Sequence, residues 1–267
     1  MTKFPPVVLC LSGHDPSGGA GVQADIQTLS LLGCYPCSVV TALTAQDTRN
    51  VQAIMPQREE DFLAQARLIL EDLPVAAIKI GLLGNAGIAS AVRKILRELP
   101  GIPVVLDPIL AAGGGKDLAR EDLIAVLKSH LLPLTTVLTP NTVEARRLAG
   151  KFENLDECAG ELLRLGCAHV LITGTHDPGE AVVNRWYGPQ GVHAYRWERL
   201  PHSYHGSGCT LASALGGFLA LGVDMEGAVQ QAQEFTWQAL QSGFALGKGQ
   251  HLPNRLWLRR RCQTEPK

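Results

Sequence analysis

The sequence has few aromatic residues, no long apolar run and almost no net charge. Phe, Trp and Tyr make up only 5% of the 267 residues, so the core must be built mainly from Leu, Val, Ile and Ala, which is typical of α/β proteins. The apolar run Val7–Leu11 is too short for a signal-peptide core or a membrane span, and no other segment is long enough. We therefore expect a soluble, cytoplasmic protein without a membrane partner.

The balance of charge excludes further classes. The chain has 24 Lys and Arg against 25 Asp and Glu, so it lacks the basic surface that nucleic acids or anionic membranes attract. Any phosphate site must be local. The basic cluster of Arg255 with Arg259, Arg260 and Arg261 indicates a solvated tail over about residues 255–267, beyond an ordered core of about residues 7–250.

Other patterns of site residues are also missing. The seven cysteines are odd in number and scattered, which indicates reduced thiols rather than a disulfide framework. The eight histidines show no spacing that would hold zinc. Gly113-Gly114-Gly115-Lys116 is followed by Asp117 and lacks the frame of a nucleotide-binding P-loop.

The dominant rhythm is a short apolar run, a loop with Gly, Pro or Asn, and a helical stretch, which predicts an α/β fold with a mostly parallel sheet covered by helices. The predicted strands are Val7–Leu11, Ser38–Ala45, Ala76–Ile80, Val104–Asp107, Thr136–Thr139 and His169–Thr173. The predicted helices are Gly21–Leu32, Glu59–Asp72, Ala86–Leu99, Ala119–His130, Thr142–Ala149, Leu155–Leu165, Cys209–Leu221 and Met225–Phe244. Ala181–Trp197 indicates an antiparallel hairpin at a sheet edge, and no linker divides the chain, so residues 1–267 are expected to form one domain.

Glycine is in excess, at 28 residues or about 10% of the chain against a usual 7%. The loop Gly206-Ser207-Gly208-Cys209-Thr210 precedes a nearly all-apolar helix, so its amides would converge on an anion at the helix N-terminus. A thiol there is expected to have a lowered pKa, which makes Cys209 a candidate base or nucleophile. Alternatively the glycines only cap a buried helix and Cys209 is a small filler.

A second glycine-rich loop, residues 13–21, joins the first strand to the first helix. Gly19-x-Gly21-x-x-Ala24 matches a loose dinucleotide fingerprint, but Asp15-Pro16-Ser17 intervene after Gly13, so a substrate loop is the better interpretation. Asp25 shares a helix face with apolar positions and is therefore either paired structurally or directed at a ligand. Gln46, at the end of a buried strand, could match an aminopyrimidine edge or be an ordinary strand-end residue.

Acidic residues follow two further strands. Asp107 ends the run Val104–Leu106, and Asn141 and Glu144 follow Thr139-Pro140. Strand-end carboxylates of this kind can hold Mg²⁺ directly or through water. For Asn141 and Glu144 the alternative is a helix capping box.

Taken in order from about Val7 to Gly249, these segments resemble the hydroxymethylpyrimidine/phosphomethylpyrimidine kinases of thiamin biosynthesis, in the ribokinase-like superfamily. The motifs that carry the resemblance are residues 13–25, 41–48, Lys79-Ile80-Gly81-Leu82-Leu83, Leu106-Asp107-Pro108, Thr139-Pro140-Asn141-x-x-Glu144 and residues 205–210. It implies a three-layer α/β/α ribokinase-like fold, use of ATP and Mg²⁺, a homodimer, and two successive phosphorylations of 4-amino-5-hydroxymethyl-2-methylpyrimidine.

The resemblance also implies residue roles. The pyrimidine pocket falls on Gly13, Asp25, Gln46 and Leu82, the catalytic position on Cys209, and the anion hole on the amides of Gly206, Ser207, Gly208 and Cys209. Asp107, Asn141 and Glu144 fall on the ATP side, with Asp107 and Glu144 toward Mg²⁺.

Two departures from the family pattern concern the nucleotide. Relatives often have Lys-Gly-Gly-His where this chain has Thr173-Gly174-Thr175-His176, and many have Ala-Lys-Ser-Gly where it has residues 112–115. Lys116 or Lys248 could supply the missing charge. The rival functions are a pyridoxal or pyridoxine kinase of the same superfamily, a dinucleotide-dependent oxidoreductase and a non-catalytic ligand sensor; Gln46 favours the pyrimidine, because such pyridoxal enzymes tend to have Met there.

Overall fold

The computed structural model describes residues 4–112, 115, 117–150, 152 and 154–257. Their strands form one nine-stranded sheet in the order β3-β2-β1-β4-β5-β6-β7-β8-β9. The strands are β1 (Val7–His14), β2 (Tyr35–Gln46), β3 (Val51–Pro56), β4 (Val75–Ile80), β5 (Val104–Leu106), β6 (Val137–Leu138), β7 (His169–Ile172), β8 (Ala181–Gly188) and β9 (Gly191–Glu198). The α-helices are α1 (Gly21–Leu31), α2 (Glu59–Asp72), α3 (Ala86–Glu98), α4 (Glu121–Val126), α5 (Thr142–Ala149), α6 (Leu155–Arg164), α7 (Ser207–Ala220) and α8 (Met225–Gln241).

The middle of the sheet is parallel, from β2 through β1, β4, β5 and β6 to β7. Most of its strands are mainly apolar because helices cover both faces; β1, for example, is buried from Val7 to Gly13. The six strands predicted from such runs are all present.

Both edges of the sheet are antiparallel. The hairpin β8–β9 pairs with β7, which confirms the hairpin predicted over Ala181–Trp197. At the other edge β3 pairs with β2 through a short turn, and this strand was not predicted. Its segment Val51–Pro56 is mostly exposed, so it lacks the apolar run that indicates a buried strand.

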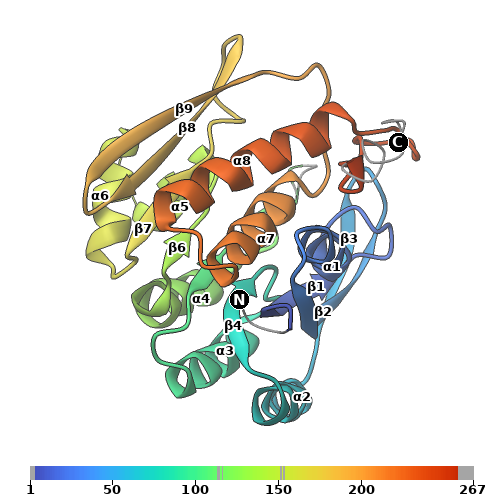
Figure 1. The fold of residues 1–267 in the computed structure, drawn as a ribbon, viewed down its shortest axis with the longest axis vertical. Helices are drawn as coiled ribbons and strands as arrows, with labels where there is room; N and C mark the ends of the chain where they lie inside the picture. The colour runs from blue at the N-terminus through green and yellow to red at the C-terminus, as the bar shows by residue number, and fades with distance from the viewer. Residues whose placement is uncertain (1–3, 113–114, 116, 151, 153, 258–267) are drawn as a thin grey trace.

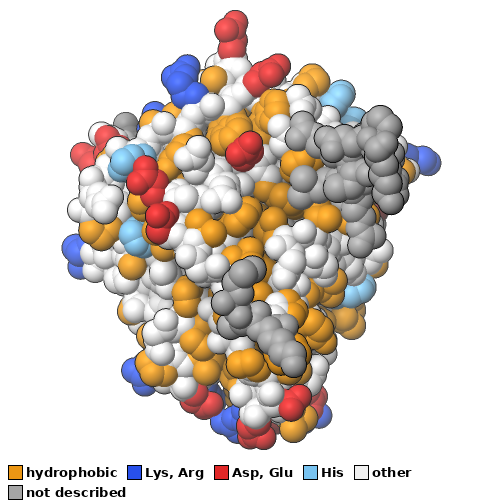
Figure 2. All heavy atoms as spheres, in the orientation of Figure 1, with side chains coloured by type: hydrophobic (Ala, Val, Ile, Leu, Met, Phe, Trp, Pro, Cys, Tyr) orange, Lys and Arg blue, Asp and Glu red, His pale blue; other side chains and the backbone are white. Residues whose placement is uncertain are grey.

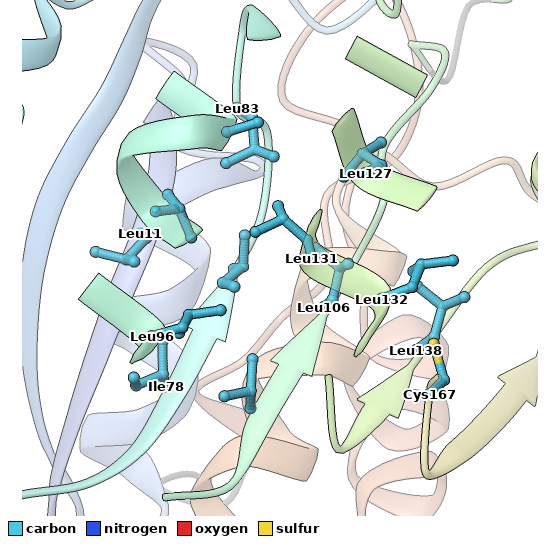
Figure 3. Packing of buried hydrophobic residues seen from close by; sticks show 14 of the residues in the cluster. Leu11, Ile78, Leu83, Leu96, Leu106, Leu127, Leu131, Leu132, Leu138 and Cys167 are labelled. Atoms are coloured by element: carbon cyan, nitrogen blue, oxygen red, sulfur yellow. The ribbon is translucent and has the colours of Figure 1, made fainter. Parts of the chain in front are cut away.

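The helices form two layers around the sheet (Figure 1). Side chains of α2 to α6 pack on one face, in the cluster part of which Figure 3 shows. Side chains of α1, α7 and α8 pack on the other face. Successive residues of β1 alternate between these layers: Leu9 and Leu11 belong to the first, and Val8 and Cys10 to the second. The expected three-layer α/β/α architecture is confirmed.

The helix predicted over Ala119–His130 is shorter as a regular α-helix than expected. After α4 the chain forms a π-helical turn, Leu127–Leu131, and a 3₁₀ turn, Leu132–Leu134. Pro133 lies in that last turn and has no N–H to donate, so the helix cannot continue through it.

The described residues contain no helix that is both long and apolar enough to span a bilayer. Acidic and basic side chains are interspersed around the rim of the face in Figure 2. Because parallel strands end at one edge of the sheet, the loops after β1, β4, β5, β6 and β7 are expected to bind ligand there, together with the start of α7.

Candidate active site

The predicted anion hole lies at the first turn of α7. Gly206 is the N-cap residue and has φ +87°, a left-handed conformation that favours glycine. A Cβ on Gly206 would lie 1.9 Å from the carbonyl oxygen of Gly19, so the substrate loop and the α7 loop are in direct contact. No side chain caps α7, and the first N–H groups of a helix have no partner within it. The amides that start at Ser207 can therefore bind an anion.

Cys209 lies in this first turn but is almost fully buried. Its thiol hydrogen-bonds the Asp107 carboxylate, and the amide of Gly21 faces its sulfur. Burial raises the pKa of Cys209 to about 12; the Lys79 ammonium lowers it, and the carboxylates of Asp107 and Asp25 raise it further. The expected lowering of the thiol pKa is therefore wrong, because loss of solvent outweighs the helix N-terminus.

Asp107 follows β5 and is 5% exposed. Burial raises its pKa to about 7, with Lys79 lowering it and Glu144 raising it. A Cβ on Gly208 would lie 3.4 Å from Asp107 Oδ2, so this carboxylate stands beside the anion hole.

Asn141 and Glu144 form the capping box of α5. Asn141 Oδ1 accepts the amides of Val143 and Glu144 at 2.9 Å each, and Glu144 Oε2 accepts the amide of Asn141 at 3.0 Å. The other oxygen of Glu144, Oε1, accepts the amide of Leu110 at 2.9 Å, and burial raises the pKa of Glu144. The alternative left open by the sequence is thus present, and it holds Glu144 close enough to raise the pKa of Asp107.

The described residues contain no group of three or more His, Cys, Asp or Glu side chains placed as metal ligands. Mg²⁺ nevertheless needs only one or two protein carboxylates beside water and phosphate oxygens. Asp107 and Glu144 are two buried carboxylates whose pKa values are both raised, so a divalent cation between them would relieve their cost of ionisation. The donor set fits Mg²⁺, with Asp107 as the better placed ligand.

Asp25 belongs to a buried ionic network beneath the anion hole. Lys79 Nζ lies 2.8 Å from Asp25 Oδ1 and donates to Ser12 Oγ at 3.0 Å, while Ser213 Oγ donates to Asp25 Oδ1 at 2.6 Å. Although burial lowers the pKa of Lys79, pairing with Asp25 raises it overall, so the ammonium stays charged. Lys79 was not predicted as a site residue, although a lysine inside the buried strand β4 was a signal.

The remaining residues assigned to the pyrimidine pocket come together at the ends of β1, β2 and β4. A Cβ on Gly13 would lie 2.9 Å from Leu82 Cδ2, so the two residues are in contact. Gln46 Nε2 donates to Thr44 Oγ1 at 2.8 Å, and Thr44 Oγ1 donates to the carbonyl of His14 at 2.9 Å. Gln46 also lines an open cleft of about 400 Å³ with residues of the substrate loop and with Lys248.

A second cavity, of about 130 Å³, adjoins the anion hole. Ser207 and Gly208 line it, as do Thr173 and Thr175 after β7. Trp197 and Trp237, stacked at 6.3 Å, also line it. None of the described residues that line this cavity is a lysine, and Lys116 lies outside the described part of the chain.

Comparison with known proteins identifies the family. Residues 15–254 match the family model described as phosphomethylpyrimidine kinase. The chain belongs to the phosphomethylpyrimidine kinase family. One relative of this kinase, the hydroxymethylpyrimidine/phosphomethylpyrimidine kinase of Synechococcus elongatus, is 38% identical over 252 residues, which cover 92% of this chain and 95% of the relative.

Solved structures agree with this assignment of the kinase. The phosphomethylpyrimidine kinase of Clostridium difficile is 33% identical, with a TM-score of 0.75 over 88% of this chain and 98% of that one. An ADP complex of Bacillus subtilis pyridoxal kinase is 29% identical, with a TM-score of 0.87 over 96% of this chain and 99% of that one. The ribokinase-like fold expected for the kinase is confirmed.

The buried position of Arg255 contradicts the prediction of a solvated tail that begins at about residue 255. Its side chain is 2% exposed and contacts both glycine loops, so the ordered part extends at least to this residue. The prediction was wrong because Arg255 was grouped with Arg259, Arg260 and Arg261, which lie outside the described residues. His205 was also left without a role; its Nε2 lies 2.8 Å from Asp15 Oδ2 across the same two loops.

Proposed function

We propose that this kinase transfers the terminal phosphoryl group of ATP to the hydroxyl of 4-amino-5-hydroxymethyl-2-methylpyrimidine, and a second one to the resulting monophosphate. The observation that carries the proposal is the convergence of three features at one point. The α7 amides, the Cys209 thiol and the Asp107 carboxylate meet between the substrate loop and the cavity beyond β7.

Phosphoryl transfer requires positioning and stabilisation of the charge on the transferring group more than it requires covalent chemistry. The amides at Gly206, Ser207, Gly208 and Cys209 supply that stabilisation without a basic side chain. The nucleotide would then extend from Gly208 into the cavity lined by Thr173, Thr175 and the two tryptophans.

Mg²⁺ held by Asp107, with Glu144 behind it, would place positive charge against the phosphate oxygens of the nucleotide. Asn141 serves this arrangement by fixing Glu144 through the capping box. Because burial already raises the pKa of Asp107 to about 7, this carboxylate gains most from a bound cation.

Cys209 is the proposed acceptor of the proton from the substrate hydroxyl. Lys79 favours the thiolate, whereas Asp107 opposes it. In the second step the acceptor is already an anionic phosphate, so a base matters less.

The pyrimidine would lie against Gly13 and Leu82, with the Gln46 amide at its edge. Asp25 would contribute from below: its Oδ2 atom is buried and has no hydrogen-bond partner among the described residues. An amino group of the ring would donate to that oxygen, which is fully buried in this structure.

A pyridoxal kinase is the second candidate, since the chain resembles such an enzyme with a TM-score of 0.87. One assay separates the two. Purified protein is incubated with Mg-ATP and, separately, with the hydroxymethylpyrimidine, its monophosphate or pyridoxal, and products are detected by mass. We expect both pyrimidines to be phosphorylated; product from pyridoxal alone would instead favour the second candidate.

We also propose that the kinase works in the cytoplasm as a homodimer. The six cysteines in the described part of the chain are free and buried, which suits a reducing compartment. Leu43 and Met55 pair across the β2–β3 edge and are 43% and 46% exposed, so they form an apolar patch suited to a second copy.

A further inference from the structure

The segment Phe244–Arg255, here called the C-terminal strap, crosses the loops that form the active site. At its middle, the amide of Gly249 donates to Thr48 Oγ1 at 3.0 Å, and this attaches the strap to the β2–β3 turn beside Gln46. Farther along, the carbonyl of His251 accepts the amide of His205 at 2.9 Å, just before the anion hole. The strap thus contacts two site loops through its backbone.

Arg255 ends the strap and joins the substrate loop to the α7 loop. Its Nη2 donates to the carbonyls of Gly19, in the substrate loop, and of Gly206, at 3.5 Å, before α7. Its Nε donates to Thr210 Oγ1 at 2.9 Å, and its Nη1 donates to Gln27 Oε1 at 3.3 Å. One side chain therefore contacts the substrate loop, α1, the α7 loop and α7 itself.

The Gly19 carbonyl depends on this donor, and the Gly206 carbonyl shares it. Both carbonyl oxygens accept from Arg255 Nη2. The two glycines are so close that a Cβ on Gly206 would overlap the carbonyl oxygen of Gly19. Without Arg255 the buried Gly19 carbonyl would lose its donor beside the Gly206 carbonyl, which would keep the amide and the hydroxyl of Thr210 at 3.0 and 2.8 Å. Only a planar guanidinium offers several N–H groups in fixed directions; a lysine ammonium is a single point.

The Arg255 side chain stays positively charged although it is buried. Loss of solvent lowers its pKa to about 10, while Cys209, Asp25 and Asp15 raise it, so the side chain is cationic at neutral pH. A second contact between the same loops, from His205 Nε2 to Asp15 Oδ2, does not reach either glycine carbonyl. Arg255 is thus the one side chain among the described residues that donates to both of these carbonyls.

We propose that Arg255 is a positioning residue that holds the substrate loop, residues 13–21, in place against the anion hole at residues 206–209. The inference rests on the proposed function for its catalytic consequence: the acceptor hydroxyl and the transferring phosphoryl group are aligned only when the two loops keep their contact. A misplacement of about 1 Å can cost on the order of a hundredfold in rate.

The test compares Arg255→Gln and Arg255→Lys with Phe62→Leu, a core change on α2, far from both loops, that lowers stability generally. Amide hydrogen exchange is followed by mass spectrometry over residues 13–21 and 206–210 without substrate. We expect Arg255→Gln to speed amide exchange at least about tenfold in both loops. In Phe62→Leu, exchange in the two loops should change no more than exchange in the rest of the chain. Unchanged exchange in the loops of Arg255→Gln would overturn the proposal.

Kinetics give the second measurement. We expect kcat to fall at least about tenfold in Arg255→Gln for both pyrimidines, with partial recovery in Arg255→Lys. Millimolar guanidinium should restore part of the rate to Arg255→Gly and none to Phe62→Leu. Full activity in Arg255→Gln at unchanged stability would contradict the positioning role. Because exchange is measured without substrate, loosened loops in a protein that phosphorylates neither pyrimidine would overturn the proposed function and leave the coupling of the loops standing.

Discussion

At the residue scale, Cys209 is a neutral thiol, and only the first of the two proposed phosphorylations needs a base. We predict that Cys209→Ala lowers the rate of phosphorylation of the hydroxymethylpyrimidine about a hundredfold or more, and that of its monophosphate much less. Product formation by mass gives both rates. Cys158→Ala, a change at a buried cysteine on α6, is the control and should alter neither rate. Equal losses with the two substrates would argue against a role in proton transfer.

The pKa of Asp107 sets a second prediction at this scale. Protons and Mg²⁺ compete for the same carboxylate, and with a pKa of about 7 the group is increasingly protonated as the pH falls below neutrality. The Mg²⁺ concentration that gives half-maximal activity should therefore rise by up to about tenfold for each pH unit below 7 and change little above 8. Titrations of activity with Mg²⁺ at pH 6, 7 and 8 measure this. A constant requirement over that range would show that Asp107 does not bind the metal.

At the scale of elements, the Lys79–Asp25 pair ties β4 to α1, and Ser213 extends it to α7. Removing one partner leaves the other buried charge unpaired, so Lys79→Met should lower the free energy of unfolding by about 3–5 kcal/mol. Adding Asp25→Asn to Lys79→Met should recover part of that loss.

Urea unfolding measures these energies. Arg164→Gln breaks a surface pair with Glu161 on α6, in which the Arg164 side chain is exposed, and should change stability little. Additive losses at Lys79 and Asp25 would mean that the two charges do not depend on each other.

The elements also show what the sequence could predict. Buried strands such as β1 and β4 are mostly apolar and were found, while the exposed edge strand β3 gave no such pattern. Asn141 and Glu144 match a capping box because that device is local. The pKa of Cys209 and the burial of Arg255 depend on residues far away in the chain, which no local pattern contains.

At the scale of the whole molecule, the exposed patch at the β2–β3 edge bears on assembly. Met55→Asp would place a charge in an interface formed by Leu43 and Met55, so we predict that this variant is monomeric where the unchanged protein is dimeric. Light scattering after gel filtration gives the mass of each. Leu68→Asp, at an exposed position on α2, is the control. A dimer that persists in Met55→Asp would place the interface elsewhere.

The C-terminal strap also fixes the order in which the enzyme can mature on the ribosome. The substrate loop at residues 13–21 leaves the exit tunnel early, but its contact with Arg255 spans more than two hundred positions in the chain. The sheet and both helix layers can therefore assemble around a nascent chain whose catalytic loops are still apart. With Arg255 in its proposed role, full activity in phosphoryl transfer is acquired last, when residue 255 has been made and can reach the glycine carbonyls.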